Sequence, residues 1–358
     1  MHLSLHKKAY KDILLIANGH EVYLDELSHL AENIHIIDSY LDNKNYLTSI
    51  DTLKEFICKK KLNKKETKVI YASGLEGKEH IQKYLDDNFH ICGNSFSDFR
   101  YLGNAYNIDT KLFTDAVVIP EKSNDYNYKY ISKDYDSTGG LGIGNNISSK
   151  NIYYQRYIPG ATFSISFLAD NSKISLLGFN QIFTVKNNIK YPFLYAGAMN
   201  INFKNNLRNK MIDWVQEFTR FYQLKGFISI DFKVFENKIY LIDINPRLSG
   251  TYRIYKNKYK NLMASHVMSV EPISLYNDAY HSYIILYAKS SFKIKKSINE
   301  IKNISDVPKI GQTIEKDEPI LTVNVSAQTE NELREYIKNT IKCVMEIIDC
   351  YNVDLEYE

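Results

Sequence analysis

The stretch GFISIDFKVFENKIYLIDINPRLSG, residues 226–250, decides the fold. Apolar residues alternate with polar ones in residues 227–235 and again in residues 238–244, and Glu236-Asn237 separates the two runs. Alternation of this kind is typical of strands with one buried face, and a short polar pair between two such runs is typical of a tight turn. The sequence therefore predicts a β-hairpin.

The oxygen-bearing side chains of this hairpin include Asp231 on the first strand, and Asp243 and Asn245 on the second. Residues two apart on a strand face the same side, so Asp243 and Asn245 point together. If Asp231 lies opposite them, two carboxylates and an amide oxygen converge. These hard ligands suit Mg²⁺, with Mn²⁺ as the alternative. A lone aspartate is more often an ordinary exposed residue, but the combination favours a metal site. Arg247 adds a guanidinium that can hold phosphate or carboxylate with two hydrogen bonds.

The middle third of the chain, before the hairpin, has the pattern of an α+β region. Residues 152–158, 163–168 and 174–179 are predicted strands separated by turn residues. A helix is expected over residues 209–224, with Gly226 as its C-terminal stop. Four glycines within Ser137–Gly144 predict a mobile loop.

The two ends of the chain alternate strands and helices. Residues 13–17 and 69–72 are short apolar runs that break at Asn18-Gly19 and Ser73-Gly74, as buried strands of a parallel α/β layer do. Asn18-Gly19 is not a GxGxxG fingerprint, so a dinucleotide site has little support. Beyond the hairpin, strands are expected at residues 283–287 and 319–325, and a helix at residues 329–348.

The hairpin resembles the signature of the ATP-grasp superfamily, in which an aspartate on one strand is followed by E-x-N-P-R on the next. Here the second segment reads Asp243-Ile-Asn-Pro-Arg247, with aspartate where glutamate is usual. The shorter side chain keeps the charge and leaves open whether the site holds one metal ion or two. The resemblance implies a nucleotide site for ATP with a divalent metal ion.

The resemblance extends to both sides of the hairpin and implies roles for further residues. Lys133 looks like the lysine that contacts the nucleotide phosphates, and the glycine-rich loop looks like the flap over them. Acidic residues that the family often has at positions 155 or 156 and near Thr162 are missing here. The implied ATP-binding residues are Lys133, Gly139, Gly140, Gly142, Gln155, Arg156, Tyr157 and Ile158, and weaker candidates for the substrate pocket are Ser249, Gly250 and Tyr252.

Within the superfamily, Gly93-Asn94-Ser95 and residues 191–198 and 311–325 resemble carboxylate–amine ligases, such as the tyramine–glutamate ligases and related ligases of one-carbon-cofactor biosynthesis. In these enzymes ATP converts a carboxylate into an acyl phosphate, an amine then displaces phosphate, and ADP and phosphate are released. An amino acid such as glutamate is expected as one substrate, with Arg247 contacting the transferred phosphoryl group. Two alternatives remain: a non-catalytic nucleotide-binding sensor or degenerate subunit, and an ATP-grasp carboxylase or formate-using ligase.

The predicted architecture is α/β plus α+β, an ATP-grasp fold in four parts. Residues 1–95 form an N-terminal α/β domain, and residues 96–155 a small subdomain that carries the flap. Residues 156–270 form the catalytic subdomain with an antiparallel sheet, and residues 271–358 form a C-terminal α/β extension packed on it.

Composition limits the other possibilities. Lys and Arg total 45 against 42 acidic residues, and the net charge of +3 predicts no nucleic-acid face. No apolar run approaches the length of a membrane helix. The four cysteines, Cys58, Cys92, Cys343 and Cys350, show no CxxC spacing, so a cytoplasmic protein is expected. HExxH and GxSxG are absent, which excludes the common zinc and serine hydrolases. Small-molecule carboxylate and amine substrates are the expected partners, and a homodimer stays open.

Overall fold

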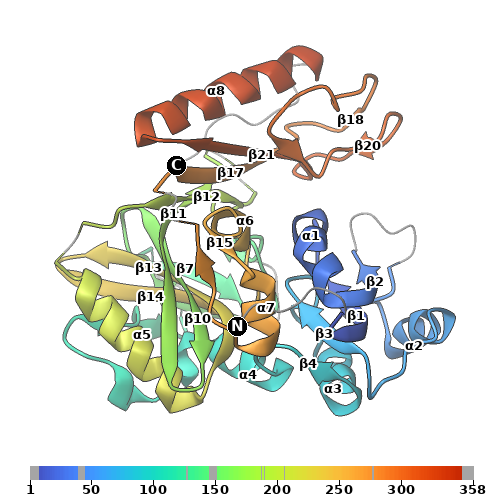
Figure 1. Ribbon diagram of the computed structural model, residues 1–358. Helices are drawn as coiled ribbons and strands as arrows, with labels where there is room; N and C mark the ends of the chain where they lie inside the picture. Colours follow the sequence, from blue (N-terminus) through green and yellow to red (C-terminus); the bar gives the residue numbers. More distant parts are fainter. Residues whose placement is uncertain are drawn as a thin grey trace.

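The N-terminal layer is a four-stranded parallel sheet in the computed structural model, which describes residues 8–38, 45–125, 128–144, 151–186, 188, 190–204, 206–275 and 278–348 (Figure 1). Its order is β2-β1-β3-β4, and the central strand β1 buries Ile13–Ile16 completely. Both predicted N-terminal strands are confirmed. The bounds are β1 Tyr10–Ile16, β2 Ala31–Ile37, β3 Lys68–Tyr71, β4 His90–Ile91, α1 Glu21–Leu30, α2 Ile50–Lys59, α3 Glu79–Asn88 and α4 Phe96–Leu102.

A nine-stranded sheet forms the body of the molecule. Its order is β19-β21-β17-β12-β11-β10-β13-β14-β5, and every neighbouring pair is antiparallel except β14 with β5. The antiparallel sheet predicted for the middle of the chain is confirmed. The bounds are β5 Val117–Val118, β10 Thr162–Asp170, β11 Lys173–Thr184, β12 Tyr195–Ile201, β13 Lys225–Phe235, β14 Lys238–Asn245, β17 Tyr280–Tyr287, β19 Ile304–Ser305 and β21 Pro319–Ala327.

A small sheet carries the glycine-rich loop. It has the order β6-β9-β7-β8, with β6 Lys122–Ser123, β7 Tyr130–Asp134, β8 Ile143–Gly144 and β9 Ile152–Arg156. The remaining elements are short connections: 3₁₀ turns Ala105–Asn107 and Thr110–Leu112, α6 Tyr252–Tyr255, α7 Leu262–Met268, and the two-stranded sheets β15 Tyr259–Lys260 with β16 Ile273–Ser274 and β18 Phe292–Lys293 with β20 Thr313–Ile314.

The predicted domain limits stay predictions, but the strand pairing shows how the parts are joined. β5, from the segment 96–155, pairs with β14 of the large sheet, and β17, from the segment 271–358, pairs with β12. One sheet therefore runs across two of the predicted limits. Near the C-terminus of the chain, α8, Glu330–Ile347, lies over β21 and β17 of this sheet (Figure 1). Thr329 caps this helix with Glu332 in a reciprocal capping box.

Helix α5, Arg208–Tyr222, covers one face of the large sheet with the apolar face that the sequence predicts. Its predicted C-terminal stop at Gly226 is wrong. The residue in the left-handed conformation at the helix end is Gln223, with φ of 52°, while Gly226 already lies in β13. The glycine is needed there because its φ is +73° and a Cβ would lie 2.5 Å from Nδ1 of His266.

His266 of α7 closes this contact by accepting a hydrogen bond at Nδ1 from the N–H of Phe227, at 2.9 Å. The ring is buried, and burial lowers the pKa of His266 to about 4. An acceptor at Nδ1 requires the neutral imidazole. Protonation would therefore break the hydrogen bond as well as charge a buried group.

Stability should fall on acidification because of His266. An unfolded histidine titrates near 6.5, so between pH 6.5 and pH 4 the unfolded chain binds the extra proton and the folded chain does not. The shift costs about 3 kcal/mol of unfolding free energy across that window. His266→Asn keeps an acceptor for the N–H of Phe227 and does not titrate. Urea unfolding at pH 7 and pH 4.5 should show a larger loss in the wild type than in the variant, and equal losses would contradict this role.

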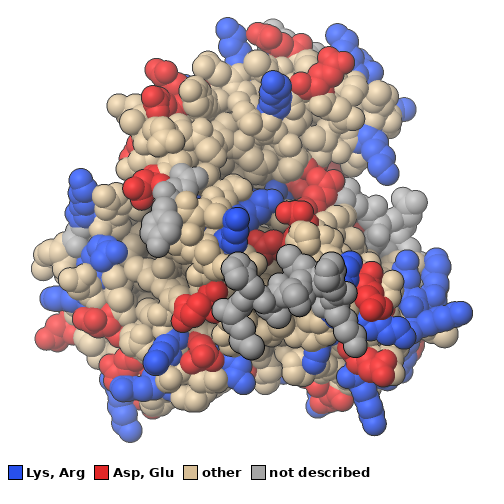
Figure 2. All heavy atoms as spheres, viewed as in Figure 1, with Lys and Arg blue, Asp and Glu red and all other residues tan. Residues whose placement is uncertain are grey.

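The surface carries charges of both signs. Figure 2 shows basic and acidic side chains interspersed over the face in view. The dense basic run of residues 59–65 begins at the end of α2, and its lysines are exposed, as expected for a solvated helix end. Among the described residues no helix has the length and apolar character needed to cross a membrane. Cys58, Cys92 and Cys343 are free thiols, and Cys350 lies outside the described residues.

Candidate functional site

The hairpin of β13 and β14 brings Asp231 and Asp243 directly opposite each other, and Ser229 opposite Asn245. The turn residues Glu236 and Asn237 both have positive φ, 47° and 56°, as a two-residue hairpin turn with the twist of the strands requires. This turn fixes the register. The convergence of the two carboxylates that the sequence allowed is therefore present.

A bulge distinguishes this hairpin from a regular ladder. Asp231 pairs with Asp243, whereas the next residue, Phe232, pairs with Leu241, so Ile242 is the extra residue. A bulged residue leaves its backbone groups outside the ladder and turns the strand. The carbonyl of Ile242 instead accepts a hydrogen bond from Nζ of Lys133, at 2.9 Å. The bulge thus attaches the lysine of β7, in the small sheet, to the acidic strand of the large one.

The two aspartates form an acidic pair that lacks charge balance. Burial, followed by repulsion from Asp243, raises the pKa of Asp231 to about 8, although Lys133 and Arg247 oppose the shift. Burial lowers the pKa of Lys133, and both aspartates oppose that shift. Facing carboxylates of this kind take up a proton or a cation. The Nδ2 of Asn245 donates to Asp243, at 3.2 Å, which leaves the amide oxygen as a third oxygen donor beside the two carboxylates.

These residues line a cavity of about 570 Å³ between the small sheet, the large sheet and the N-terminal layer. It is large enough for a nucleotide and part of a second molecule. From the sequence candidates the lining includes Lys133, Gly139, Gly140, Gln155, Arg156, Tyr157, Ile158, Asp231, Asp243, Asn245, Arg247, Ser249 and Gly250.

The glycine-rich loop lies across the cavity and rests on the segment before β12. The carbonyl of Gly139 accepts a hydrogen bond from the N–H of Tyr195, at 2.9 Å. Gly140, at φ of +79°, lies so close to Phe193 that a Cβ would overlap the carbonyl of that residue. Gly142 lies outside the lining, and a Cβ there would overlap the side chain of Ser137 within the loop.

Strand β9 of the small sheet and the residues after it form one wall of the cavity. The side chain of Gln155 is buried and donates to the hydroxyl of Tyr106, at 3.2 Å. The N–H groups of Arg156 and Tyr157 donate to the carbonyls of Glu121 and Lys129, both at 2.8 Å. In the part of the chain that the structure describes, the N–H of Ile158 has no protein acceptor. That N–H is a backbone donor on this wall that no group of the described residues uses.

Arg247 lines the cavity, but the N-terminal layer holds most of its guanidinium. Nη1 donates to the carbonyl of Ala72, at 2.5 Å, and Nη2 lies 3.1 Å from Oε1 of Glu76. The guanidinium also lies 5.7 Å from the ring centres of both Tyr71 and Phe99. Among the described residues Nε has no partner. The sequence did not reveal Glu76, although its place just after β3, at the carboxyl edge of a parallel sheet, is a known signal for ligand sites.

Residues 249–251, which follow the acidic strand, also line the cavity. Ser249 and Thr251 share a hydrogen bond of 2.9 Å between their hydroxyls, and Thr251 shares another of 2.9 Å with the buried Ser166. Thr251 was not among the sequence candidates. The placement of Tyr252 in the substrate pocket is wrong: its ring is fully buried against Tyr23 and lies outside the lining. The short helix α6 begins at this residue and turns it toward α1.

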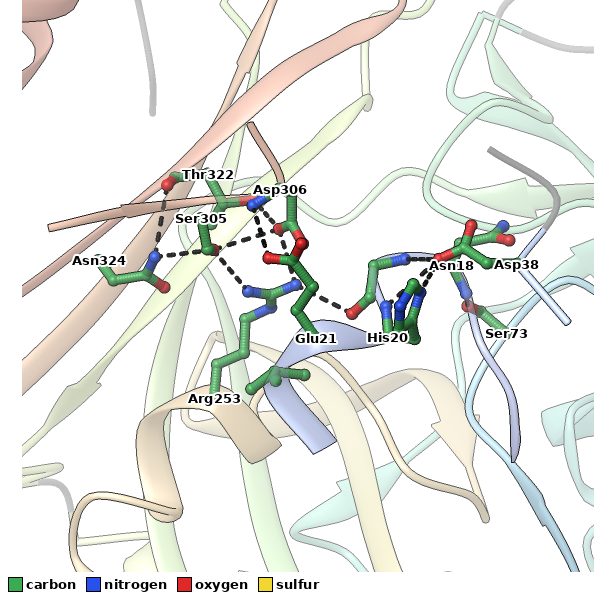
Figure 3. A network of polar contacts seen from close by, with 12 residues as sticks. Asn18, His20, Glu21, Asp38, Ser73, Arg253, Ser305, Asp306, Thr322 and Asn324 are labelled. Atoms are coloured by element: carbon green, nitrogen blue, oxygen red, sulfur yellow. Dashed lines mark hydrogen bonds and ion pairs between the residues drawn. The ribbon is translucent and has the colours of Figure 1, made fainter. Parts of the chain in front are cut away.

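A second polar network lies where the three parts of the chain meet (Figure 3). Arg253 of α6 donates to Asp306, at 2.8 Å, to Ser305, at 3.0 Å, and to the carbonyl of Gly19, at 3.3 Å. Thr322 of β21 also donates to Asp306, at 2.7 Å. This network joins the end of β1, the segment after the acidic hairpin and the C-terminal strands. None of its members lines the cavity described above.

Replacing Arg253 with methionine should destabilise the protein by about 2–3 kcal/mol, because Asp306 would remain largely buried without its cation. The side chains of Arg253 and Asp306 are only 13% and 21% exposed. Arg334→Met is the matched control, since Arg334 pairs with Glu330 at 2.7 Å but both are 44% exposed. Urea unfolding should give a loss under about 0.5 kcal/mol for the control. Equal losses of unfolding free energy in the two variants would show that Arg253 does not stabilise the contact between β1, the segment after the hairpin and the C-terminal strands.

Comparisons with known proteins match part of the chain to one family model. Residues 102–251 match the model of the ATP-grasp domain. An uncharacterised protein of Methanocaldococcus jannaschii is 28% identical over 284 residues, which are 72% of this chain and 67% of that protein. The tyramine–L-glutamate ligase of the same organism is 28% identical over 227 residues, 60% of this chain and 68% of the ligase.

A solved structure shows how far the fold extends. The biotin carboxylase of Campylobacter jejuni, in a complex described as β-γ-ATP, superimposes with a TM-score of 0.69 at 13% identity, covering 93% of this chain and 91% of that one. A ligase and a carboxylase thus resemble the same chain. The fold therefore does not decide between the two reactions.

Proposed function

Since residues 102–251 of this chain form an ATP-grasp domain and the chain has the ATP-grasp fold, we propose that the protein is an ATP-dependent carboxylate–amine ligase. It activates the acid as an acyl phosphate, and an amine then forms the amide. ATP and Mg²⁺ are the cofactors that this assignment requires.

The observation that carries the proposal is the pair Asp231 and Asp243, facing each other in a cavity under a glycine loop. The two carboxylates face each other, the pKa of Asp231 is raised by burial and by repulsion from Asp243, and the amide oxygen of Asn245 completes a set of hard oxygen donors for a cation. Mg²⁺ held there would neutralise charge on the β and γ phosphates of ATP.

The remaining groups of the cavity fit the rest of the nucleotide. Lys133 lies beside the aspartates and offers its ammonium to the phosphates, while its bond to Ile242 fixes its position. The backbone of Gly139 and Gly140 can approach phosphate oxygens closely because no side chain intervenes. The N–H of Ile158 offers a donor to a ring nitrogen of the base.

The reaction has two steps. A carboxylate oxygen of the acid attacks the γ phosphorus of ATP, the bond to the bridging oxygen breaks, and ADP leaves. The amine nitrogen then attacks the acyl carbon, phosphate leaves with the former carboxylate oxygen, and the nitrogen loses a proton. The protein acts mainly by positioning the reactants and neutralising charge. Arg247, whose guanidinium is paired with Glu76, contributes its positive charge beside the cavity.

An acid and an amine are the substrates that the relatives favour. The tyramine–glutamate ligase joins such a pair, and its resemblance to this chain makes L-glutamate and tyramine the first pair to test. The fold shared with a biotin carboxylase makes bicarbonate the main competitor for the acid site.

The test is phosphate release by the purified protein with Mg·ATP, measured over a panel of acids and amines. The acids are the protein amino acids with L-glutamate first, followed by formate and bicarbonate. The amines are tyramine, the amino acids and ammonium. A ligase releases ADP and phosphate only when both partners are present, and mass spectrometry then finds the amide. Release that needs only bicarbonate would indicate a carboxylase, and nucleotide binding without any release would indicate a sensor.

A further inference from the structure

Two tyrosine hydroxyls meet at the wall of the cavity that the aspartates also line. Tyr195, the first residue of β12, lines the cavity, and its hydroxyl forms a short hydrogen bond with that of Tyr283 on β17. Tyr283 is 2% exposed. Gly250, which also lines the cavity, lies so close to this pair that a Cβ would overlap the hydroxyl of Tyr283.

One of the two hydroxyl hydrogens of this pair has no acceptor within the pair. Two hydroxyls carry two hydrogens, and the bond between them uses one. Within the described ranges neither hydroxyl has another partner. If Tyr195 donated to Tyr283, the spare hydrogen would be left in the buried interior without an acceptor, which is unfavourable. The favourable arrangement has Tyr283 donating to Tyr195, so that the hydrogen of Tyr195 points into the cavity.

This hydroxyl is a donor and not a base. Burial, followed by the neighbouring phenol, raises the pKa of Tyr195 well above its usual value, and Asp231 raises it further. Burial also raises the pKa of Tyr283. Both phenols therefore keep their hydrogens at every working pH, and the spare hydrogen needs an oxygen acceptor that arrives with a ligand.

The position of the Tyr195 hydroxyl in the cavity indicates which ligand oxygen accepts its hydrogen. Asp231 is close enough to disfavour the phenolate of Tyr195, and Gly250, which follows the acidic strand in the chain, lies against both tyrosine hydroxyls. In the proposed ligase the acid meets the nucleotide beside these aspartates, so the hydroxyl of Tyr195 lies near the acid. The main chain of Tyr195 also holds the glycine loop, through its N–H and the carbonyl of Gly139. Closing the loop and presenting the hydroxyl thus involve the same residue.

We propose that the hydroxyl of Tyr195, oriented by Tyr283, donates a hydrogen bond to an acyl oxygen of the acid substrate. The inference rests on the proposed ligase function. A neutral donor at this point holds the carboxylate for attack on ATP and then stabilises the oxyanion that forms when the amine adds to the acyl phosphate. No base chemistry is assigned to it.

The test compares Tyr195→Phe, Tyr283→Phe and the double variant with the wild type, using the acid that gives the fastest phosphate release in the panel, L-glutamate being tried first. Tyr195→Phe should lower kcat/KM for the acid at least tenfold, while KM for ATP stays within about twofold. Tyr283→Phe should cost about threefold, because the remaining hydroxyl loses its orientation. The double variant should be no worse than Tyr195→Phe, since only one hydroxyl contacts the acid.

Tyr287→Phe is the matched control. Its hydroxyl donates to the carbonyl of Tyr195, at 2.8 Å, and so supports the same strand without belonging to the pair. Unchanged kcat/KM for the acid in Tyr195→Phe, or an equal loss in the control, would overturn the role of Tyr195 and leave the ligase proposal standing. A wild type that releases no phosphate with any acid would instead refute the ligase proposal, and this inference with it.

Discussion

Replacing Asp231 with asparagine should lower ATP-dependent turnover by about 1,000-fold or more, while the protein stays folded. The change removes one of the two charges that would hold Mg²⁺ against the phosphates, and about 4 kcal/mol of barrier is the expected scale for losing that neutralisation. Asp243→Asn should have the same effect because the two residues face each other. Phosphate release under saturating substrates measures it.

The urea midpoint of Asp231→Asn shows whether a loss of turnover comes from the site or from unfolding. Burial and Asp243 hold the pKa of Asp231 above its ordinary value, so the folded state binds a proton that the unfolded state releases between about pH 4 and pH 8. This carboxyl therefore destabilises the metal-free protein as the pH rises. Asp231→Asn should have a urea midpoint equal to or above that of the wild type at pH 7.5. Asp213→Asn, on the exposed side of α5, should change neither quantity. Normal turnover in either hairpin variant would refute the metal site.

The variant Asp243→Glu asks a finer question about the same site. Glutamate is the residue that the ATP-grasp pattern has at this position, and it keeps the negative charge. We expect activity within about tenfold of the wild type. An inactive glutamate variant would show that the bulge at Ile242 has adapted the hairpin to the shorter side chain.

Replacing Gly140 with alanine should lower kcat/KM for ATP by about a hundredfold, because the added Cβ overlaps the carbonyl of Phe193 and the loop can no longer settle over the cavity. Gly139→Ala is the matched control. Gly139 also has positive φ, +63°, but a Cβ there meets nothing within 4 Å. Backbone strain alone should cost it about fivefold, from about 1 kcal/mol.

Limited proteolysis is a second test of whether the glycine-rich loop closes over the nucleotide. Cleavage within residues 137–144 should slow in the wild type when Mg·ATP is added, because the loop then closes over the nucleotide. Gly140→Ala should lose this protection and Gly139→Ala should keep it. Equal cleavage of the wild type with and without Mg·ATP would contradict a flap.

The acidic hairpin could be predicted because its determinants are local. Alternating apolar residues give the strands, and Glu236-Asn237 fixes the register that puts Asp231 opposite Asp243. The bulge at Ile242 has no comparable local signal. The helix end was mispredicted for the same reason: Gln223 adopts positive φ, while the glycine three residues later serves a distant contact with His266.

The parts of the site that the sequence missed come from long-range contacts. Tyr195 and Tyr283 are 88 residues apart and meet only because β12 pairs with β17. Glu76 reaches Arg247 only because the N-terminal layer packs against the end of β14. Periodicity determines which face of an element is buried, but it does not determine which elements become neighbours. Residue types at the carboxyl edges of strands are the one signal that pointed toward such positions.

The central claim, that ATP activates a carboxylate by phosphorylation, is tested most directly with an acid substrate labelled with ¹⁸O in its carboxylate. Phosphate released in a single turnover should carry one ¹⁸O, because one carboxylate oxygen leaves with the phosphoryl group. ADP should be unlabelled. Label found in AMP would show that the acid is adenylated instead, and unlabelled phosphate would show that ATP is hydrolysed without activating the acid.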